Sequence, residues 1–336
     1  MKIAIIGAGA WGTALSIALT RRDKHSVSLW AFEKEVVASI RSVRINQAFL
    51  PGHELPRGVS ATNDLEEALR DAELLVGVMP SHHCRKVYEQ MVGKKLLRNG
   101  IPFVSATKGI EQESLLRMSE VITEVVSRSG AQPRVAAISG PSFALEVAKG
   151  DPTAITVASK DSALASLVQR EFSDASLRMY TNDDVVGVEM GGALKNVIAI
   201  AAGVCDGMGL GHNTAAALMT RGLAEISRLA VACGAKRETL LGLAGMGDLV
   251  LTCTGGLSRN RSVGVGLGKG RRLAEIIAEM HGMVAEGVLT TNAAMGLAQK
   301  MKIEMPITEQ MYAILHEGKP AREAIRELMT RPYAME

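Results

Sequence analysis

Aromatic residues are scarce in this chain of 336 residues, in which Phe, Trp and Tyr together make up 3%. Proteins that bind nucleic acid typically combine basic clusters with aromatic side chains for base stacking. The net charge here is only +3, and no basic run is interleaved with aromatics. We therefore expect no nucleic-acid partner and an aliphatic, alanine-rich core, in which the 17 methionines act as filler.

Cysteine is also scarce, and no two cysteines form a CxxC pair. Widely spaced cysteines of this kind predict reduced thiols in a cytoplasmic protein. His82, His83 and Cys84 carry metal-binding groups, but adjacent residues do not converge on one ion as spaced ligands do. The sequence thus predicts no metal site. The four cysteines are Cys84, Cys205, Cys233 and Cys253.

Long uninterrupted apolar runs are missing as well. The first residues, MKIAIIGAGAWGTALSIALTRR, resemble a signal peptide, but regularly spaced glycines interrupt the apolar run. No run approaches the roughly 18 residues that span a bilayer. We therefore expect a soluble protein without membrane insertion.

Short apolar runs instead alternate with helical patterns in the first half of the chain. Helical patterns between the runs include DLEEALRDA at 64–72 and SLLRMSEVITEVV at 114–126. This alternation predicts an α/β fold with an N-terminal doubly wound, Rossmann-type parallel sheet. The expected strands are 2–7, 27–31, 73–79, 102–106, 134–139, 153–158 and 176–180.

Strand signals stop after Asp183, and helical patterns follow at 216–234, 271–280 and 308–318. A chain of this length exceeds one ordinary core, so two domains are expected. We predict a sheet domain over residues 1–183 and an all-helical domain over residues 184–336. The last residues, RPYAME, are predicted to be mobile.

The segment GAGAWG follows the first predicted strand and opens a helix, and its Gly7, Gly9 and Gly12 fit the GxGxxG pattern. In this pattern the first glycine makes a tight turn, the second admits a pyrophosphate, and the third lets helix and strand pack closely. The free N–H groups of the helix N-terminus then face the phosphates. The sequence predicts a dinucleotide site here, although a purely structural turn is the alternative.

Such sites also carry an acidic residue at the end of the second strand, which binds the adenosine ribose. Glu33 lies at that place, just after Phe32. A carboxylate repels the 2′-phosphate of NADP, so this pair favours NAD. An ordinary loop glutamate is the alternative interpretation.

Two further segments follow predicted strands, where doubly wound sheets bind ligands. Lys108 ends SATKG and is placed to meet an anion or a carbonyl, unless it is a solvated loop lysine. Ser142 follows Gly140 and Pro141 in SGPSF. It either caps a helix or marks a close backbone approach to a ligand.

In the helical half, VVGVEMGGALKNVIAIAAG (185–203) places Lys195 and Asn196 inside an apolar stretch. A buried ammonium costs several kcal/mol unless it has partners, so either Lys195 has them or its stem snorkels to the surface. Asp248 offers a carboxylate that would keep a buried lysine charged, although it also suits a helix cap.

LAGMGDLVLTCTGGLSRNR (243–261) contains Asp248, Thr252 and the run Ser258, Arg259 and Asn260. An arginine with neighbouring hydroxyl and amide donors makes a natural phosphate clamp. The basic run 269–272, in contrast, is interpreted as a solvated face.

Taken together and in order, eight segments resemble the NAD(P)-dependent glycerol-3-phosphate dehydrogenases, with spacing intact to about residue 310. The resemblance implies interconversion of dihydroxyacetone phosphate and sn-glycerol 3-phosphate with NAD(H) or NADP(H), in support of phospholipid synthesis. It also implies a cytoplasmic homodimer. The segments are GAGAWGTA, FLPGHELP, VMPSH, SATKGIE, ISGPSFALEV, GALKNVIAIAAG, AGMGDLVLTCTGGLSRNR and VAEGV.

The resemblance also implies roles for single residues, with Lys195 as the catalytic acid/base. Two positions depart from many bacterial members: Ala10 stands where they have Ser, and Phe32 where they have a basic residue that suits NADPH. The implied substrate-binding residues are Lys108, Gly140, Ser142, Lys195, Asn196, Asp248, Thr252, Ser258, Arg259 and Asn260. The implied cofactor-binding residues are Gly7, Gly9, Ala10, Trp11, Gly12, Phe32, Lys108, Ala144, Arg259, Val284 and Glu286.

Two other functions compete with this one. A β-hydroxyacid dehydrogenase shares the two-domain layout and a catalytic lysine, but it would need a carboxylate-binding site in place of the SRN clamp. A dinucleotide-sensing module without turnover would need an effector-binding or DNA-reading segment, and the sequence offers none.

Overall fold

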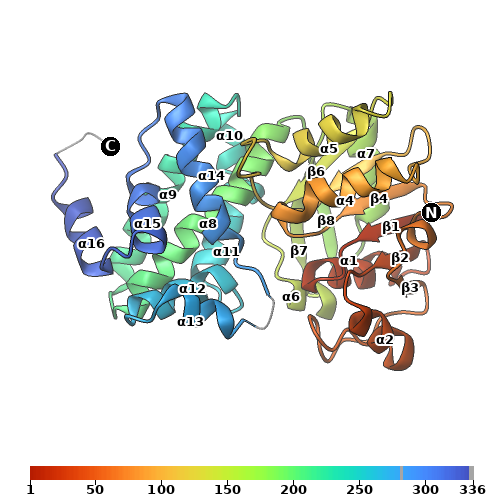
Figure 1. Ribbon diagram of the computed structural model, residues 1–336, viewed down its shortest axis with the longest axis horizontal. Helices are drawn as coiled ribbons and strands as arrows, with labels where there is room; N and C mark the ends of the chain where they lie inside the picture. The colour runs from red at the N-terminus through yellow and green to blue at the C-terminus, as the bar shows by residue number, and fades with distance from the viewer. Residues whose placement is uncertain (281–282, 333–336) are drawn as a thin grey trace. The chain divides into compact units, whose positions relative to one another are not determined.

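The computed structural model describes residues 1–280 and 283–332, which fall into two compact units (Figure 1). One unit contains residues 1–108 and 116–189, and the other contains residues 109–115 and 190–336. The sequence places the division after residue 183 and does not indicate that 109–115 joins the second unit. Most of the RPYAME tail lies outside the described residues.

The first unit is built on one sheet of eight strands, in the order β3-β2-β1-β4-β5-β6-β7-β8. The doubly wound sheet is confirmed, with β3 as a strand that the sequence patterns did not predict. Strands β1 to β6 pair in parallel, but β7 pairs antiparallel to β6, which corrects the expectation of an all-parallel sheet. The strands are β1 (Lys2–Ile6), β2 (Ser26–Trp30), β3 (Val59–Thr62), β4 (Leu74–Gly77), β5 (Phe103–Ser105), β6 (Val135–Ser139), β7 (Thr153–Ala158) and β8 (Leu177–Asn182).

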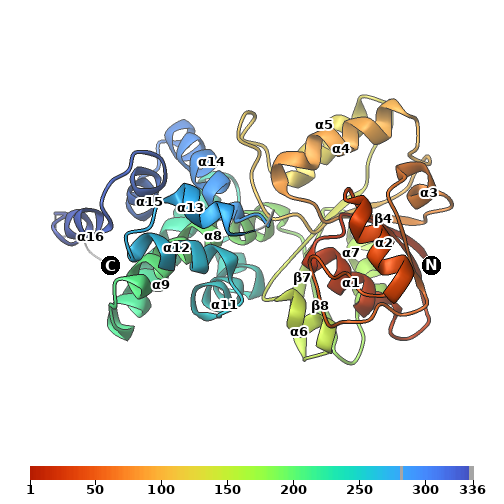
Figure 2. The ribbon, with the colours of Figure 1, turned by 60° about the horizontal axis from the view of Figure 1, so that its bottom comes forward.

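Helices cover both faces of this sheet, because successive side chains of each buried strand point to opposite sides. One core lies under α1, α2, α6 and α7, and the other under α3, α4 and α5. Figure 2 shows α4 and α5 on one side of the strands and α1 and α6 on the other. The helices are α1 (Ala10–Thr20), α2 (Lys34–Val43), α3 (Leu65–Leu69), α4 (Ser81–Gly93), α5 (Met118–Ser127), α6 (Ala144–Lys149) and α7 (Ser162–Phe172).

Helix α5 begins later than the apolar pattern at 114–126 predicts. Leu115 has a φ of +60°, a left-handed conformation that a helix does not continue through. The backbone N–H of Ser119 instead donates to the Glu189 carboxylate at 2.8 Å. This tertiary contact satisfies one of the free N–H groups in the first turn of α5 and fixes where the helix starts.

From α8 onward, all the named elements within the described residues are helices, as the sequence predicts. Helix α8 starts in the first unit and continues into the second without a break. No loop in the sequence therefore marks this boundary between the units. The elements are α8 (Val185–Gly207), α9 (His212–Ala232), α10 (Arg237–Leu240), the π-turn η1 (Leu243–Gly247), α11 (Asp248–Thr254), α12 (Arg259–Gly268), α13 (Leu273–Ala278), α14 (Glu286–Met301), α15 (Pro306–His316) and α16 (Ala321–Met329).

Helix α8 lies against its neighbours at backbone distance, which explains the many small residues in its sequence. A Cβ atom at Gly203 would lie 2.0 Å from the carbonyl oxygen of Arg261 in α12. A Cβ at Gly264 of α12 would in turn lie 2.0 Å from the carbonyl oxygen of Ile200. The two helices can therefore cross this closely only where both lack a side chain.

We expect Gly203→Ala to destabilise the protein, although alanine is the better helix former. Helix propensity favours the variant by up to about 1 kcal/mol, but a forced backbone separation costs about 1–3 kcal/mol or more. The melting temperature should fall in a circular dichroism or calorimetric scan. Gly256→Ala is the matched control, because no atom lies within 4 Å of a Cβ there. Equal melting temperatures for the two variants would contradict the close crossing.

By length and composition, α8 is also the one helix among the described residues that could cross a membrane, with a mean hydropathy of 1.5. The sequence patterns had suggested no such segment. The bent pair formed by 237–254 and 259–268 passes the same test when taken together. Core helices share this composition, and the most apolar window of α8 is 89% buried in the protein.

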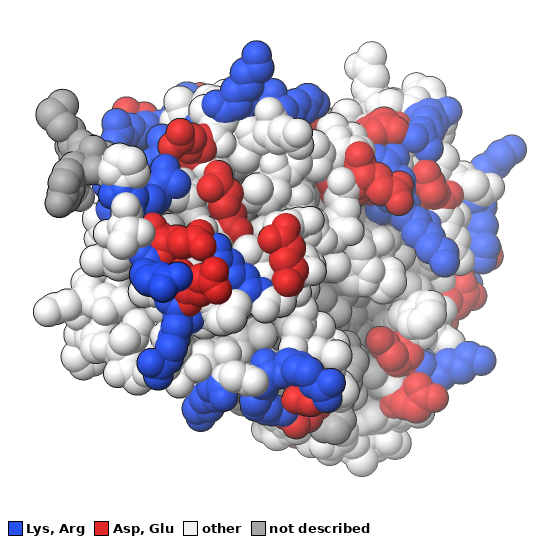
Figure 3. All heavy atoms as spheres, turned by 60° about the vertical axis from the view of Figure 1, so that its left-hand side comes forward, with Lys and Arg blue, Asp and Glu red and all other residues white. Residues whose placement is uncertain are grey.

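Acidic and basic side chains are intermingled on the face of the helical unit seen in Figure 3. The arginines of the basic run 269–272 also have acidic partners, because Arg271 and Arg272 pair with Glu279 and Glu275. These arginines are exposed and their partners are neighbours in sequence. They form the solvated face that the sequence predicts.

Candidate active site

The glycine loop between β1 and α1 has the geometry that its pattern predicts. Gly7 has a φ of +122°, and a Cβ there would lie 2.3 Å from the carbonyl oxygen of Val78. A Cβ at Gly12 would lie 1.9 Å from the carbonyl oxygen of Gly7. Around Gly9, in contrast, no atom lies within 4 Å of a Cβ position. The protein itself thus requires Gly7 and Gly12, whereas Gly9 leaves open space for a ligand.

This open space lies at the N-terminus of α1, where Gly9 is the N-cap and provides no side-chain hydrogen bond. Ala10 and Trp11 form the first turn, which has no acidic side chain to repel a phosphate. The backbone N–H groups of that turn can therefore bind an anion. The residues present fit the pyrophosphate of a dinucleotide.

Asn46 supports this loop and was not found from the sequence. Its buried side-chain amide donates to the carbonyl oxygen of Ala8 and to the hydroxyl of Thr13, at 2.8 Å each. Asn46 lies far from the glycine motif in the chain. In the sequence, Asn46 stands out only as a polar residue between the apolar pattern of α2 and the FLPG segment.

The end of β2 presents the predicted ribose-binding pair. Phe32 is 79% exposed, and its ring meets the edge of Trp30 at a centroid distance of 6.5 Å. Glu33 is the N-cap of α2, but its carboxylate makes no capping hydrogen bond. The Phe32 ring is thus largely exposed although it touches Trp30, and the Glu33 carboxylate does not cap α2.

Lys108, Gly140 and Ser142 come together at the carboxyl ends of β5 and β6. The Lys108 ammonium donates to the carbonyl oxygen of Gly140 at 3.1 Å, and the Ser142 hydroxyl donates to the same oxygen at 3.0 Å. Gly140 has a φ of +144°, and a Cβ there would lie 2.9 Å from Cα of Ile155. Ala144 begins α6 directly after this turn. The turn therefore gathers a cation and a hydroxyl at the ligand-binding edge of the sheet.

Lys195 is buried in α8 and does not snorkel to solvent. Its ammonium forms an ion pair with Asp248 and donates to the Thr252 hydroxyl at 2.8 Å. The Lys195 side chain is 7% exposed and that of Asp248 is 2% exposed. The carboxylate compensates the buried positive charge, which would otherwise be costly. A preorganised ammonium is thus held inside the helical unit.

Local structure positions the partners of Lys195. The π-turn η1 ends at Gly247 and places Asp248 at the start of α11, one turn before Thr252. Such turns frequently occur at functional sites. Burial raises the pKa of the neighbouring Cys253 thiol to about 12. This cysteine therefore remains a neutral thiol at pH 7 and is no rival proton donor or nucleophile.

The SRN run starts helix α12. The Ser258 hydroxyl accepts a hydrogen bond from the backbone N–H of Arg261 at 3.2 Å, so Ser258 is the N-cap. Arg259 is an exposed residue, but crowding by protein atoms lowers the pKa of its guanidinium, which the Glu286 carboxylate opposes. A guanidinium stays charged in proteins. Arg259 thus presents a positive charge near Glu286, and Val284 lies in the loop just before α14.

The two predicted asparagines are also hydrogen-bonded to each other. The Asn260 amide nitrogen donates to the Asn196 side-chain oxygen at 2.9 Å. Gly287, which the sequence analysis did not single out, donates its backbone N–H to the Asn260 side-chain oxygen at 2.9 Å. In the sequence, only its position in the VAEGV segment could have pointed to Gly287 as a site residue.

The structure therefore gathers the predicted residues into two groups, one in each unit. The first unit holds the glycine loop, Phe32 and the turn at Gly140, all beyond carboxyl ends of strands. The second holds the Lys195 ion pair, the two asparagines and the start of α12. No group of three His, Cys, Asp or Glu side chains suited to a metal ion occurs within residues 1–280 and 283–332.

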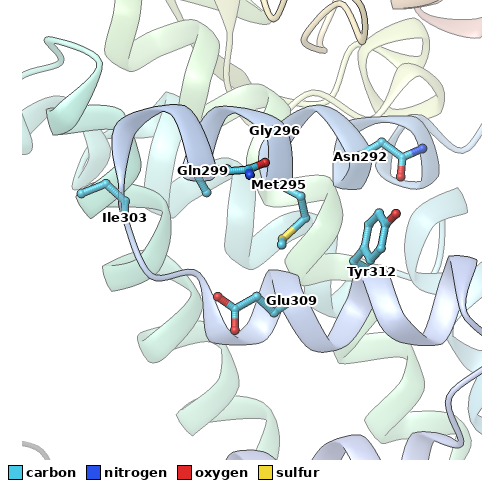
Figure 4. A pocket seen from close by; sticks show the side chains of 8 residues that line it. Asn292, Met295, Gly296, Gln299, Ile303, Glu309 and Tyr312 are labelled. Atoms are coloured by element: carbon cyan, nitrogen blue, oxygen red, sulfur yellow. The ribbon is translucent and has the colours of Figure 1, made fainter.

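A separate hollow of about 620 Å³ lies between α14 and α15, and Figure 4 shows it from close by. Met295 and Tyr312 point into it, with Asn292 at one end. Its described lining includes none of the predicted site residues. The lining residues are Asn292, Met295, Gly296, Ala298, Gln299, Ile303, Glu309 and Tyr312.

Comparison with known proteins agrees with the resemblance seen in the sequence. Residues 2–165 match the family "NAD-dependent glycerol-3-phosphate dehydrogenase N-terminus", and residues 184–326 match the corresponding C-terminus. A relative from Koribacter versatilis named glycerol-3-phosphate dehydrogenase [NAD(P)+] is 65% identical over 100% of this chain and 98% of its own. A Geobacter sulfurreducens relative of the same name is 54% identical over the same shares.

The fold has a counterpart among solved structures. The crystal structure of a glycerol-3-phosphate dehydrogenase from Coxiella burnetii is similar with a TM-score of 0.92 at 41% identity. The similarity covers 98% of this chain and 99% of that one. Because both parts of the chain match this family and the relatives align over its full length, the chain belongs to the NAD(P)-dependent glycerol-3-phosphate dehydrogenase family of enzymes.

Proposed function

We propose that this chain interconverts dihydroxyacetone phosphate and sn-glycerol 3-phosphate, with residues 1–183 binding the dinucleotide and residues 184–336 binding the substrate. The observation that carries the proposal is the buried Lys195 ammonium, held by Asp248 and Thr252 in a helix of mainly small and apolar residues. Such a group is suited to a carbonyl whose oxygen gains negative charge. Family membership supports the same reaction.

When bound, the reduced nicotinamide supplies a hydride to the carbonyl carbon of the substrate. Lys195 stabilises the negative charge that develops on the carbonyl oxygen, because its ammonium is oriented before the reaction begins. Its Nζ then donates a proton to that oxygen. Asp248 keeps the ammonium charged and fixes its direction, and Thr252 holds it from a second side. In the reverse direction, the neutral amine of Lys195 accepts the proton.

The dinucleotide would be held mainly by residues of the first unit. Gly9 leaves room for the pyrophosphate, and Ala10 and Trp11 offer backbone N–H groups in the first turn of α1. Gly7 and Gly12 shape this loop, and Phe32 offers a stacking face for adenine. Further proposed contacts are Lys108, Ala144, Arg259, Val284 and Glu286.

The substrate phosphate would be held chiefly by Arg259, whose guanidinium can bind phosphate oxygens in a bidentate way. Ser258 positions this arginine by capping α12. The remaining proposed substrate contacts are Lys108, Gly140, Ser142, Asn196 and Asn260.

In the cell, we propose that the product supplies glycerol phosphate for phospholipid synthesis. A cytoplasmic location is supported by the four cysteines, all described, none of which forms a disulfide. We further propose a homodimer on the basis of the family resemblance, which analytical ultracentrifugation would test. A single monomeric species at micromolar concentration would contradict it.

The proposed reaction is tested by following NADH and NADPH absorbance with dihydroxyacetone phosphate as substrate. We expect rapid oxidation of the cofactor with this substrate and very slow oxidation with unphosphorylated dihydroxyacetone. A 3-hydroxy acid with NAD+ tests the competing β-hydroxyacid activity and should give no turnover. Rapid turnover of the hydroxy acid, or none of the ketose phosphate, would overturn the proposal.

Cofactor preference is expected to depend on Phe32. Glu33 repels the 2′-phosphate of NADPH, and Phe32 adds no charge, whereas Lys34 can approach it. We therefore expect both cofactors to be used, with NADH favoured more than in most bacterial relatives. Phe32→Arg should shift the ratio of kcat/KM values toward NADPH by about 1–2 kcal/mol, one charge-assisted contact. Steady-state kinetics with both cofactors measures this ratio.

Phe32→Gln is the matched control, because it removes the ring without adding a charge. It should leave the NADH/NADPH ratio nearer the wild-type value than Phe32→Arg does. An unchanged ratio in Phe32→Arg would show that this loop does not read the 2′ position.

A further inference from the structure

The fully buried amide of Asn46 holds one peptide unit of the glycine loop in a single orientation. Its NH₂ group donates to the carbonyl oxygen of Ala8 and to the Thr13 hydroxyl, at 2.8 Å each. Its side-chain oxygen accepts the backbone N–H of Phe49 at 3.1 Å. The Ala8 carbonyl can only accept and the Phe49 N–H can only donate, so neither end of the amide can be exchanged for the other.

The Ala8 carbonyl needs a donor from outside the sheet, because the chain leaves the sheet at Gly7. The Gly7 N–H still donates to the carbonyl oxygen of Trp30 in β2 at 3.0 Å, but its φ of +122° turns the chain away. Ala8 is buried, so water does not satisfy its carbonyl. The Thr13 hydroxyl donates to this oxygen at 3.3 Å, and Asn46 provides the shorter bond.

This bond also sets the direction of the Gly9 N–H. The Ala8 carbonyl and the Gly9 N–H belong to one planar trans peptide unit, in which the two groups point in opposite directions. Since the carbonyl points toward Asn46, the N–H points away from it. Within residues 1–280 and 283–332, the Gly9 N–H donates to no acceptor. It lies at the start of α1, where an anion is favoured.

We propose that Asn46 is a positioning residue for the dinucleotide, which aims the Gly9 N–H at the pyrophosphate. The proposal rests on the proposed cofactor site and deepens it, because Asn46 lies outside the glycine motif and acts through the peptide unit of Ala8 and Gly9. An apolar residue of similar size would fill the same space in the core. It would not restrain this peptide unit, and glycine has no side chain that would do so.

The test is Asn46→Leu, which keeps the volume of the side chain and removes its hydrogen bonds. We expect the Kd for NADH to rise about 10- to 100-fold, because a hydrogen bond to a charged group contributes on this scale. Fluorescence titration measures this Kd. The kcat at saturating NADH and the KM for dihydroxyacetone phosphate should stay close to wild type, since the peptide unit acts on cofactor binding alone.

Two fragments of the cofactor show which part of it loses affinity. ADP-ribose contains the pyrophosphate but no nicotinamide, so its Kd should rise by the same factor as that for NADH. AMP has a single phosphate, and its Kd should rise less. Isothermal titration calorimetry measures both. If Asn46→Leu does not fold, Asn46→Ala removes the same hydrogen bonds without the branched side chain, and circular dichroism establishes that the measured protein is folded.

Ser159→Ala is the matched control for a merely structural role. The buried Ser159 hydroxyl also donates to a backbone carbonyl, that of Val135 at 2.8 Å. Val135 begins β6, whereas the glycine loop follows the end of β1. Because β1 and β6 run in the same direction, the two places lie at opposite edges of the sheet. Ser159→Ala should lower the melting temperature but leave the Kd for NADH unchanged.

Each outcome decides the role of Asn46. Equal losses of affinity for NADH and ADP-ribose, with kcat retained, would support it. An unchanged Kd for NADH in the folded variants, or an equal rise in Ser159→Ala, would overturn it. A wild-type protein that binds NADH without reducing dihydroxyacetone phosphate would contradict the proposed reaction, while the comparison of Kd values still decides the role of Asn46. A wild-type protein that binds none of the three ligands would overturn this role together with the cofactor site.

Discussion

Replacing Lys195 with methionine is expected to abolish turnover while NADH still binds. Methionine fills a similar volume in α8 but offers neither charge nor proton. General acid catalysis and electrostatic stabilisation together should account for a fall of about a thousandfold or more in kcat. Stopped assays with excess enzyme measure the residual rate, and fluorescence titration measures NADH binding.

The variant also leaves the Asp248 carboxylate buried without its cation, and that alone costs several kcal/mol. The double variant Lys195→Met/Asp248→Asn removes this charge and should regain stability but not turnover. Lys160→Met, at an exposed lysine of the sheet unit, should keep the wild-type rate. More than a tenth of wild-type activity in a folded Lys195→Met protein would show that another group supplies the proton.

Replacing Arg259 with alanine is expected mainly to raise the KM for dihydroxyacetone phosphate. A charge-assisted hydrogen bond is worth about 1.5–3 kcal/mol, which predicts a loss of about 10- to 150-fold in kcat/KM. The kcat should fall as well, because binding energy at the phosphate also orients the reacting carbonyl. Steady-state kinetics over a range of substrate concentrations separates the two effects.

Arg261 provides a matched control on the same helix, because its guanidinium pairs with Asp206 at 2.9 Å. Arg261→Ala should leave the KM close to wild type. With unphosphorylated dihydroxyacetone, Arg259→Ala and wild type should be equally slow. If Arg259→Ala lowers activity on both substrates by the same factor, the arginine does not bind the phosphate.

Much of the candidate site can be predicted from the sequence because its motifs are local. Gly7, Gly9 and Gly12 lie within six consecutive residues, and the geometry they need is set by the turn itself. The alternation of strand and helix patterns predicts a doubly wound sheet for the same reason, since each apolar period depends on neighbours in the chain. Long segments such as AGMGDLVLTCTGGLSRNR identify the family directly.

Strand direction, in contrast, cannot be predicted from these patterns. Strand β7 has the mainly apolar sequence of a buried strand whether it pairs parallel or antiparallel, so only packing beside β6 decides its direction. The first residue of α5 is likewise decided by tertiary contacts and not by the apolar pattern. The apolar period continues back to residue 114, but the hydrogen bond from Ser119 to Glu189 and the conformation of Leu115 make the helix begin at Met118.

The sequence by itself determined the fold class, the dinucleotide loop and the residue types of the site, because each depends on short-range pattern or on long recognisable segments. Tertiary structure alone decided which groups meet. Lys195 pairs with Asp248, which lies 53 residues further along the chain. Asn260 accepts a hydrogen bond from Gly287, which lies 27 residues further along. The close packing of the helices determines which of these residues meet. The glycines that allow this packing have no side chain, so their presence in the sequence does not indicate which partners they bring together.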